Sequence, residues 1–285
     1  MSGPRRIALF THTTVEDTAP GVAALLDAAI AAGVEVRLPP GEAEKHGIRA
    51  GPGVVVGEEP SDDTDLAVVL GGDGTTLTAM RAFAECPAPV FSINYGAIGF
   101  LSTVDHGELH EGIRRILSGD FEILAIPALD VQIDGARRLA VNDASFHRRP
   151  DERVAELAYS VEGEELGRVR CDGLVASTPV GSTGYNLANG GPVLAWKVGG
   201  FVVSFIAPHT LTARALVVDT ETVLEVENLS PRNPVDVSAD GRTVATLASG
   251  DRAEVRFRHD RVLLAQLPGT NFYHRLREKF GRLAK

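Results

Sequence analysis

The sequence predicts a two-part protein, with an α/β N-terminal domain built on a parallel sheet and a β-rich, sandwich-like C-terminal domain. Strand-like and helix-like segments alternate through the first third of the chain, which is typical of a parallel sheet with helical crossovers. After Phe121 the pattern changes to alternating apolar and polar residues with hairpin-type dipeptides. That pattern is typical of antiparallel strands with one face in water.

Short apolar runs predict the strands of the N-terminal domain, at residues 7–10, 34–38, 66–70 and 89–93. The run at 66–70 is continuous, which indicates a strand covered on both faces. Helices are expected at residues 18–32, 76–85 and 105–118. Pro20 is expected in the first turn of the first helix, and Gly33 at its end. The stretch from 39 to 60, rich in Pro, Gly and Glu, is expected to be a surface excursion.

The C-terminal domain shows its strand pattern most clearly at residues 157–162, 224–227 and 255–258. The dipeptides Asp134-Gly135 and Asp240-Gly241 favour tight hairpin turns. A last helix is expected at residues 271–283. The predicted division is therefore 1–120, 121–270 and a C-terminal helix in 271–285, placed to pack back on the first domain.

Composition disfavours several classes of protein. The chain has 285 residues, of which 44% are hydrophobic and 23% charged, enough for one large or two medium domains. A net charge of −10 without clustered Lys and Arg disfavours a nucleic-acid partner, and Arg137-Arg138 and Arg148-Arg149 are interpreted as solvated turns. No signal-like or ~20-residue membrane-spanning run is present. Two isolated cysteines fit a reducing compartment, so we expect a soluble cytoplasmic protein without a membrane partner.

The stretch LGGDGT, residues 70–75, follows the predicted buried strand and opens a predicted helix. Glycines there let backbone N–H groups approach a phosphate, and the helix N-terminus adds positive potential. A carboxylate repels phosphate, so Asp73 is interpreted as the proton acceptor for an attacking hydroxyl or as a ligand of a divalent cation. Either role indicates phosphoryl transfer to an alcohol. The alternative is that Asp73 caps the helix in a glycine-rich turn.

Two further polar stretches are candidates for ligand binding. NYGAIGFL, residues 94–101, follows the next predicted strand; the Asn94 amide can bind a base edge or a ribose hydroxyl, and the Phe100 ring can stack on a base. The alternative is a turn with Phe100 in the core. The pair Asn142-Asp143 interrupts strand-like sequence, and such polar groups need partners or a ligand. A bulge or turn is the alternative for this pair.

The densest polar stretch is RCDGLVASTPVGSTGYNLANGGP, residues 170–192. Its hydroxyl groups and glycines suit a ligand with many hydroxyls, such as a nucleoside, and ordinary loop chemistry explains only a part of the run. The candidate binding residues in this block are Arg170, Asp172, Thr183, Gly184, Tyr185, Asn186 and Ala188.

Taken together, these motifs resemble the NAD kinase family. LGGDGTTL resembles the family's GGDGT loop, and NYGAIGFL resembles its N-x-G-x-x-G-F-L segment. Asn142-Asp143 resembles its Asn-Glu pair, with Asp143 one methylene shorter than the usual Glu. DGLVASTPVGSTGYNLANGGP resembles its most distinctive block, and APHTLTAR and FYHRLREKFG resemble further segments. The resemblance extends over nearly the whole chain.

The resemblance implies a reaction. The γ-phosphoryl group of ATP, or in some members of polyphosphate, would pass to the 2′-hydroxyl of the adenosine ribose of NAD and give NADP. It implies Mg²⁺ or another divalent cation, without an assigned set of protein ligands. It also implies a homodimer or homotetramer in which a neighbouring subunit helps to build the site.

The resemblance also implies roles for single residues. Asp73 would accept the proton, with Gly72 and Gly74 near the phosphates. Phe100 would lie against the adenine of NAD. The ribose hydroxyls would be held by Asn142 and Asp143, and the nicotinamide half by Asp172, Thr183, Gly184 and Tyr185.

Two other functions remain open on the sequence. A lipid kinase acting on diacylglycerol or sphingosine can share the GGDGT loop, but the hydroxyl-rich run at residues 177–189 disfavours an apolar substrate. A non-catalytic sensor of NAD or NADP can share the whole fold. The presence of Asp73 disfavours the sensor, because a sensor has no need of the proton acceptor.

Overall fold

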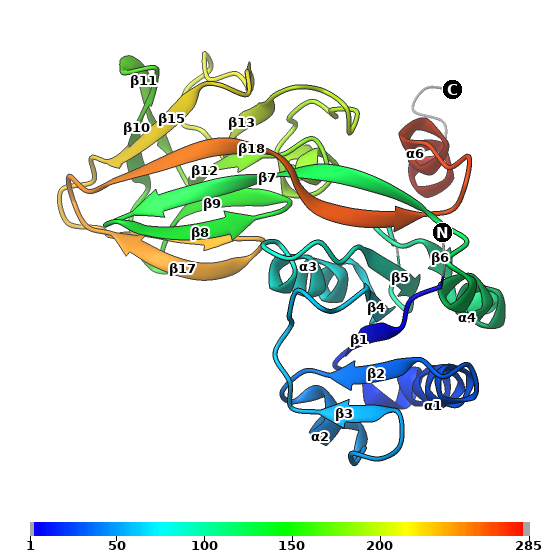
Figure 1. The fold of residues 1–285 in the computed structure, drawn as a ribbon. Coiled ribbons are helices and arrows are strands. Elements are labelled where there is room, and N and C mark those ends of the chain that lie inside the picture. Colours follow the sequence, from blue (N-terminus) through cyan, green and yellow to red (C-terminus); the bar gives the residue numbers. More distant parts are fainter. Residues whose placement is uncertain (1–2, 98, 282–285) are drawn as a thin grey trace. The chain divides into compact units, whose positions relative to one another are not determined.

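The computed structural model describes residues 3–97 and 99–281, which form two compact units (Figure 1). The first unit comprises the chain up to Ala125 together with the part from Val262 onward, and the second unit is Ile126–Arg261. A parallel-rich first part and an antiparallel, β-rich second part confirm the predicted fold class. The limits of the functional domains at residues 120 and 270 stay a prediction.

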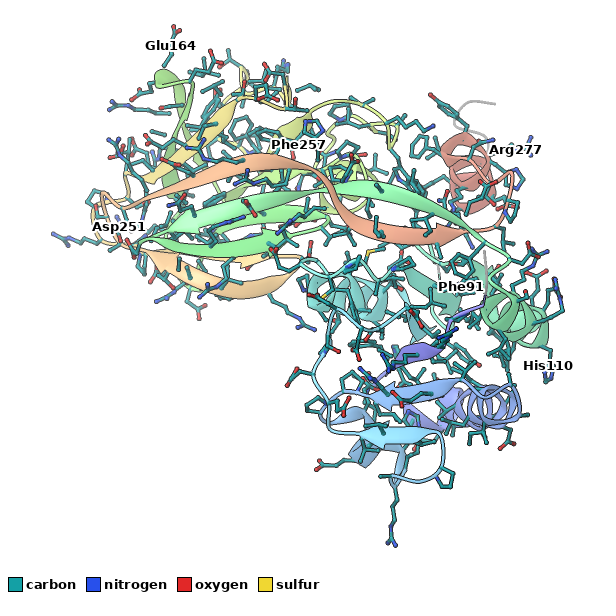
Figure 2. The ribbon with its side chains drawn as sticks, in the orientation of Figure 1. Phe91, His110, Glu164, Asp251, Phe257 and Arg277 are labelled. Carbon is teal, nitrogen blue, oxygen red and sulfur yellow. The ribbon has the colours of Figure 1, made fainter. Side chains whose placement is uncertain are left out.

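Parallel strands form the centre of the first unit. Their order is β5-β4-β1-β2-β3, and β6 and the end of β18 each pair with β5 in parallel. All six residues of β4 are buried, as expected for a strand covered on both faces. The buried core includes Phe91 of β5, whose ring makes an edge contact with Phe121 at a centroid distance of 5.8 Å (Figure 2). The strands are β1 (Arg6–Thr11), β2 (Glu35–Leu38), β3 (Val54–Val56), β4 (Leu66–Gly71), β5 (Val90–Asn94), β6 (Val104–Asp105) and β18 (Arg252–Gln266).

The helices of the first unit differ from the prediction at their ends. The first, α1, begins at Val15 rather than Thr18, so Pro20 lies inside the helix and not in its first turn. Glu16 and Asp17 occupy the first turn, where negative charge stabilises a helix. The segment 39–60, expected to be a surface excursion, contains regular structure that the sequence did not indicate: α2, and β3, which pairs with β2. The helices are α1 (Val15–Ala31), α2 (Glu42–His46), α3 (Asp73–Ala82), η1 (His106–Glu108), α4 (Leu109–Ser118) and α6 (Phe272–Phe280).

The C-terminal helix α6 belongs to the first unit, as predicted. Among the described residues, no helix combines the length and the apolar character that crossing a bilayer requires.

The second unit contains two antiparallel sheets around one core. In the first sheet β11, β10, β15 and β18 are neighbours in that order, and β7 pairs with β18 and β8. The second sheet has the order β14-β13-β12-β9-β16-β17. The buried core draws side chains from both sheets, for example Leu157 and Val226 from the first and Phe146 and Phe201 from the second.

The bounds of these strands are β7 (Glu122–Ile133), β8 (Ala136–Ala140), β9 (Asp143–Arg148), β10 (Ala155–Val161), β11 (Glu164–Cys171), β12 (Gly173–Ser177), β13 (Phe201–Ile206), β14 (Leu216–Val218), β15 (Val223–Asn228), β16 (Val235–Ala239) and β17 (Arg242–Leu247). Both predicted hairpin dipeptides connect neighbouring strands. Asp134 and Gly135 have φ of 49° and 77°, and Asp240 and Gly241 have φ of 48° and 74°, as a type I′ turn requires.

The two arginine pairs are not the solvated turns that the sequence suggested. Arg137 lies in β8 and forms an ion pair with the buried Asp130 at 2.5 Å. Arg148 ends β9 and pairs with Asp172, and Arg149 pairs with Asp236 at 2.9 Å. Sequence pattern missed these roles because each acidic partner is brought close only by strand pairing.

Candidate functional site

Asp73 is the first residue of α3, and its carboxylate binds the loop that follows β5. Oδ2 accepts the backbone N–H of Phe100 at 2.9 Å, and Oδ1 accepts that of Leu101 at 3.0 Å. Two amide donors hold the carboxylate in place, and each oxygen keeps a lone pair for a further donor. The structure therefore joins the two predicted stretches LGGDGT and NYGAIGFL through the side chain of Asp73.

The NYGAIGFL loop is closely packed, although Ile98 lies outside the described residues. Gly99 has φ of +63°, and a Cβ at this position would lie 2.4 Å from Nδ2 of Asn94. The Asn94 side chain accepts the N–H of Gly96 at 2.9 Å and donates to Asp105 at 3.0 Å. Asn94 therefore braces the loop, and its contact with a ligand stays a prediction.

Phe100 is only 5% exposed. Its ring contacts Phe272 and Phe280 of α6, with centroid distances of 6.2 Å and 5.9 Å. This arrangement agrees with the alternative that places Phe100 in the core. Contact between this ring and an adenine stays a prediction, and only a small part of the residue is accessible for it.

Arg275 of α6 was not among the predicted site residues, yet it contacts the same loop. It is 5% exposed, and its Nη1 donates to the backbone oxygen of Phe100 at 3.0 Å and to that of Ser102. Burial lowers the pKa of Arg275 to about 10, while the negative charges of Asp73, Glu278 and Asp105 act in the opposite direction. The guanidinium therefore stays protonated at neutral pH.

In the second unit, Asp240 fixes the backbone of Asn142 and Asp143. Its carboxylate accepts the N–H groups of Val141 at 3.1 Å, Asn142 at 2.6 Å and Asp143 at 3.3 Å. Oδ1 of Asn142 is buried and has no hydrogen-bond partner among the described residues. A buried acceptor without a donor is costly, so this oxygen is suited to a ligand hydroxyl.

Asp143 is 7% exposed. Burial, and then the negative charge of Asp240, raise the pKa of its carboxyl group to about 7. Near neutral pH this side chain therefore exists in both the protonated and the ionised form, which makes its binding properties sensitive to pH.

The block at residues 170–192 is anchored directly on this pair. The backbone oxygen of Asn142 accepts the N–H of Thr178 at 2.9 Å and the hydroxyl of Ser177 at 3.2 Å. At Gly181 a Cβ would lie 2.0 Å from the same oxygen, so only glycine allows this close approach. The structure therefore brings together two motifs that are far apart in the sequence.

The surface of this block is formed by Thr183 of η2 (Gly181–Thr183), by Tyr185 and Ala188 of α5 (Tyr185–Ala188), and by Gly184 between the two elements. The Tyr185 ring is 36% exposed and stacks on His147 at a centroid distance of 5.5 Å. Burial raises the pKa of Tyr185, and the charges of Asp143 and Asp172 add to the effect. Tyr185 therefore lies within electrostatic reach of both carboxyl groups.

Asn186 and Asp172 both have partners within the protein. Asn186 is fully buried, and its Nδ2 donates to the backbone oxygens of Ser182 at 3.0 Å and Pro192 at 2.9 Å. Oδ1 of Asp172 accepts a hydrogen bond from Nε of Arg148 at 2.6 Å. Asn186 thus holds the loop together, and a ligand contact for either residue stays a prediction.

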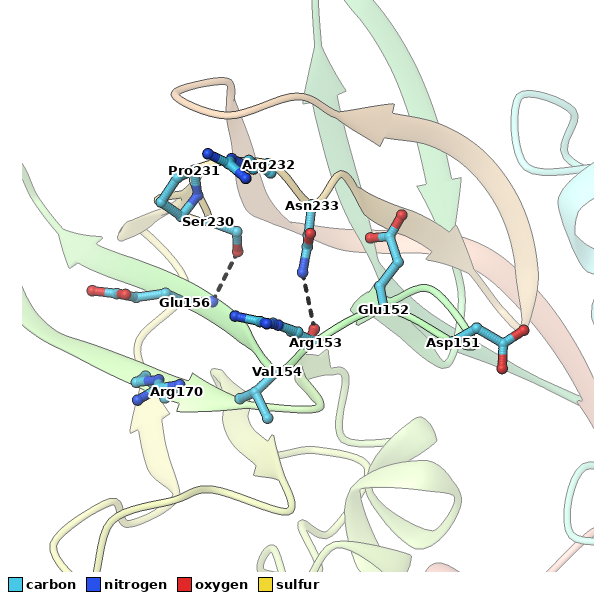
Figure 3. Close-up of a pocket in the computed structure, with 10 residues that line it drawn as sticks. All are labelled: Asp151, Glu152, Arg153, Val154, Glu156, Arg170, Ser230, Pro231, Arg232 and Asn233. Carbon is cyan, nitrogen blue, oxygen red and sulfur yellow. Dashed lines mark hydrogen bonds between the residues drawn. The ribbon is translucent and has the colours of Figure 1, made fainter.

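Arg170 points into a different place, a cavity of about 740 Å³ within the second unit (Figure 3). Three arginines line it, Arg153, Arg170 and Arg232, together with Asp151, Glu152 and Glu156. Figure 3 shows Arg170 on β11 and Arg153 just before the start of β10, beneath the loop that carries Arg232. Of the predicted site residues in the described chain, Arg170 alone lines this cavity.

Sequence reasoning missed Arg275, Asp240 and His147 as parts of these sites. Asp240 did give a signal, but as half of a hairpin dipeptide and not as an anchor for Asn142. Arg275 lies in FYHRLREKFG, a segment that resembles the family, but nothing in that segment pointed to the loop, because its carbonyl partners are 173 and 175 residues away in sequence. Within residues 3–97 and 99–281, no group of three or more His, Cys, Asp or Glu side chains is placed to hold a metal ion.

Models of two protein domains match this chain, one in its N-terminal part and one in its C-terminal part. A model of the ATP-NAD kinase N-terminal domain matches residues 53–121, and one of the ATP-NAD kinase C-terminal domain matches residues 141–266. The NAD kinase of Rhodopirellula baltica is 37% identical over 224 residues, which cover 77% of this chain and 72% of that protein.

Two solved structures share the fold. Yeast NADH kinase, crystallised with NADH, has a TM-score of 0.86 at 23% identity, covering 99% of this chain and 90% of that one. An NAD kinase from Archaeoglobus fulgidus, crystallised with ATP, has a TM-score of 0.73 at 25% identity over 97% of each chain. These matches confirm the resemblance seen in the motifs, and the chain belongs to the NAD kinase family.

Proposed function

We propose that this protein is an NAD kinase that transfers the γ-phosphoryl group of ATP to the 2′-hydroxyl of the adenosine ribose of NAD, giving NADP. Membership of the family supports the reaction type, and the two similar structures, crystallised with NADH and with ATP, support the two substrates. One observation identifies the proposed reacting group. The carboxylate of Asp73, at the N-terminus of α3, is held by two backbone amides of the loop after β5.

Asp73 is the proposed proton acceptor. The amides of Phe100 and Leu101 orient its carboxylate, while one lone pair on each oxygen remains to accept a hydroxyl proton. Gly72 and Gly74 flank it, and a Cβ at Gly74 would meet no atom within 4 Å, so the backbone there is open to a phosphate. The N-terminus of α3 adds favourable potential for that charge.

Asn142 and Asp143 are the proposed contacts of the ribose hydroxyls. The Oδ1 atom of Asn142 lacks a partner within the described protein, and the carboxylate of Asp143 accepts a hydroxyl donor once it is ionised. For the nicotinamide half we propose Asp172, Thr183, Gly184 and Tyr185, with the exposed Tyr185 ring as the stacking surface.

A divalent cation fits this arrangement only if ATP brings most of its ligands. Mg²⁺ is commonly held by one or two carboxylates together with substrate phosphates and water. The glycine loop offers the single carboxylate of Asp73, and no described cluster provides a protein cage. Bound with ATP, the cation would neutralise negative charge on the transferring phosphoryl group.

We further propose that the protein works as a homodimer or homotetramer in the cytoplasm. The family resemblance supports this assembly, and the net charge of −10 disfavours a nucleic-acid role. Light scattering coupled to size-exclusion chromatography at two protein concentrations measures the assembly directly.

One coupled assay tests the proposed reaction. The protein is incubated with Mg²⁺ and ATP or polyphosphate, and with NAD or diacylglycerol, and NADP is detected with an NADP-specific dehydrogenase. Formation of NADP supports the proposal. Phosphorylated diacylglycerol would indicate a lipid kinase, and calorimetric binding of NAD without any product would indicate a sensor.

A further inference from the structure

The C-terminal helix α6 contacts the loop that holds Asp73 in two ways. Its Arg275 donates to the backbone oxygens of Phe100, at 3.0 Å, and of Ser102. At the opposite ends of the same helix, Phe272 and Phe280 contact the ring of Phe100. Both contacts therefore involve Phe100, whose backbone N–H donates to Asp73.

The hydrogen bonds form a continuous series from the guanidinium to the carboxylate. The oxygen of Phe100 and the N–H of Leu101 belong to one peptide unit. Arg275 binds that unit at its oxygen, and Asp73 accepts its N–H at 3.0 Å. A cation at the oxygen polarises the unit and strengthens the N–H as a donor, because linked hydrogen bonds reinforce one another in a protein interior.

The charge of Arg275 is retained in an unfavourable environment. The side chain is 5% exposed, and burying a charged group costs free energy unless it is paired and hydrogen-bonded. Asp73 is the first of three carboxylates whose charges favour the protonated guanidinium there. An apolar residue would fill the space in α6 without that cost, so packing alone does not explain an arginine at this position.

We propose that Arg275 is a positioning residue for the reaction. It holds the segment from Phe100 to Ser102 so that two backbone N–H groups keep the carboxylate of Asp73 directed toward the acceptor hydroxyl. This inference rests on the proposed function, in which Asp73 accepts the proton.

Kinetics of three variants test the proposal. Arg275→Met keeps an unbranched side chain as far as the position of Nε but removes the guanidinium group with its charge and its donors. We expect kcat to fall about 10- to 100-fold, the size of effect that a misplaced reacting group produces, with the KM for NAD within about twofold. Arg275→Lys keeps one charged donor and should recover a part of the loss. Arg277→Met, on the exposed side of the same helix, should resemble the unchanged enzyme.

A double variant separates positioning from a general loss of structure. If Arg275 acts through Asp73, adding Arg275→Met to Asp73→Asn changes kcat by less than about twofold, because coupled residues are not additive. An equal fractional loss in both backgrounds, or a kcat for Arg275→Met within twofold of the unchanged enzyme, would overturn the proposal.

Hydrogen exchange gives a readout that does not depend on activity. The amides of Phe100, Leu101 and Ser102 should exchange faster in Arg275→Met than in Arg277→Met. Equal protection in the two variants would refute the positioning role even if the unchanged enzyme makes NADP. If the unchanged enzyme makes no NADP, the proposed function fails separately, and faster exchange would still show that Arg275 holds the loop. If Arg275→Met does not fold, Arg275→Lys carries both measurements.

Discussion

The carboxylate of Asp73 accepts the backbone N–H of Phe100 at 2.9 Å, although the two residues are 27 positions apart in the sequence. The direction of this acidic group is thus set by a loop from a neighbouring strand, in addition to its own helix. Changes in that loop should therefore act on the chemistry even where they touch no substrate.

Replacing Asp73 by Asn tests the proposed proton acceptor. An amide has nearly the same shape but cannot take up the hydroxyl proton, so we expect kcat to fall ~10²- to 10⁴-fold while NAD still binds. Steady-state kinetics and calorimetry measure the two quantities. Asp27→Asn, on the exposed surface of α1, is the control. Turnover of Asp73→Asn near that of the control would remove Asp73 from the reaction.

Gly99→Ala tests the geometry of the loop itself. Its φ of +63° disfavours any side chain, and the new Cβ would lie 2.4 Å from Asn94 and 2.7 Å from Ser102. We expect a loss of roughly 1–3 kcal/mol in the free energy of unfolding, and a lower kcat because the amides that bind Asp73 shift. Urea unfolding and kinetics measure both effects.

Gly107→Ala is the matched control for that variant, since a Cβ there meets no atom within 4 Å. If Gly99→Ala were as active and as stable as Gly107→Ala, the loop would not be the rigid support that the contacts indicate.

If Asp143 contacts the ribose of NAD as proposed, we expect NAD binding to depend on pH. Its pKa, raised to about 7, means that the carboxylate available to a ribose hydroxyl forms only as the pH rises through neutrality. We expect the Kd for NAD to fall about tenfold between pH 6 and pH 8, and Asp143→Asn to abolish this change. Asp240→Asn removes one of the two causes of the raised pKa and should move the midpoint to lower pH. A Kd with the same pH dependence in Asp143→Asn would contradict the assignment.

The same group affects stability. Folding raises the pKa of Asp143 from 3.8 to about 7, so between these values the folded protein holds a proton that the unfolded chain has released. The free energy of unfolding therefore falls across that pH range. Asp143→Asn should remove a decrease larger than ~1.4 kcal/mol, the equivalent of one pKa unit. Urea unfolding of both proteins at pH 4.5 and pH 7.5 measures the difference, and parallel pH profiles would count against the buried carboxyl.

Arg170 tests whether the cavity of the second unit takes part in substrate binding. If its guanidinium binds an anionic part of NAD or ATP, Arg170→Ala should raise the corresponding KM ~10-fold or more, because hydrogen bonds to charged groups contribute about 1.5–3 kcal/mol. Arg168→Ala, on the same strand and paired with Glu165, is the control. Equal KM values in the two variants would leave the cavity outside the site.

Local sequence could predict the features that depend on neighbouring residues alone. The apolar run of β4 indicated the strand, and the glycines around Asp73 indicated the turn and the candidate reacting group. The positive φ of Asp134-Gly135 and Asp240-Gly241 followed from their composition. In contrast, the burial of Phe100 against Phe272 depends on a segment from the other end of the chain, and no local pattern reports it.

The predicted ends of some helices and strands were wrong for a similar reason. The start of α1 at Val15 and the presence of β3 in the Pro- and Gly-rich stretch are decided by tertiary pairing, which overrides weak local preference. The anchoring of Asn142 by Asp240 joins residues 98 positions apart. Sequence pattern identified both residues and gave no sign that they meet.

The first unit is assembled from both ends of the chain, while the second is a single uninterrupted segment. The part from Val262 onward therefore has to join the N-terminal part before the first unit is complete. Arg275 lies in that later part, while the carbonyl groups that it binds lie in the earlier one. We therefore expect a chain cut before residue 262 to contain Asp73 but to be inactive, because the helix that contacts its loop is missing.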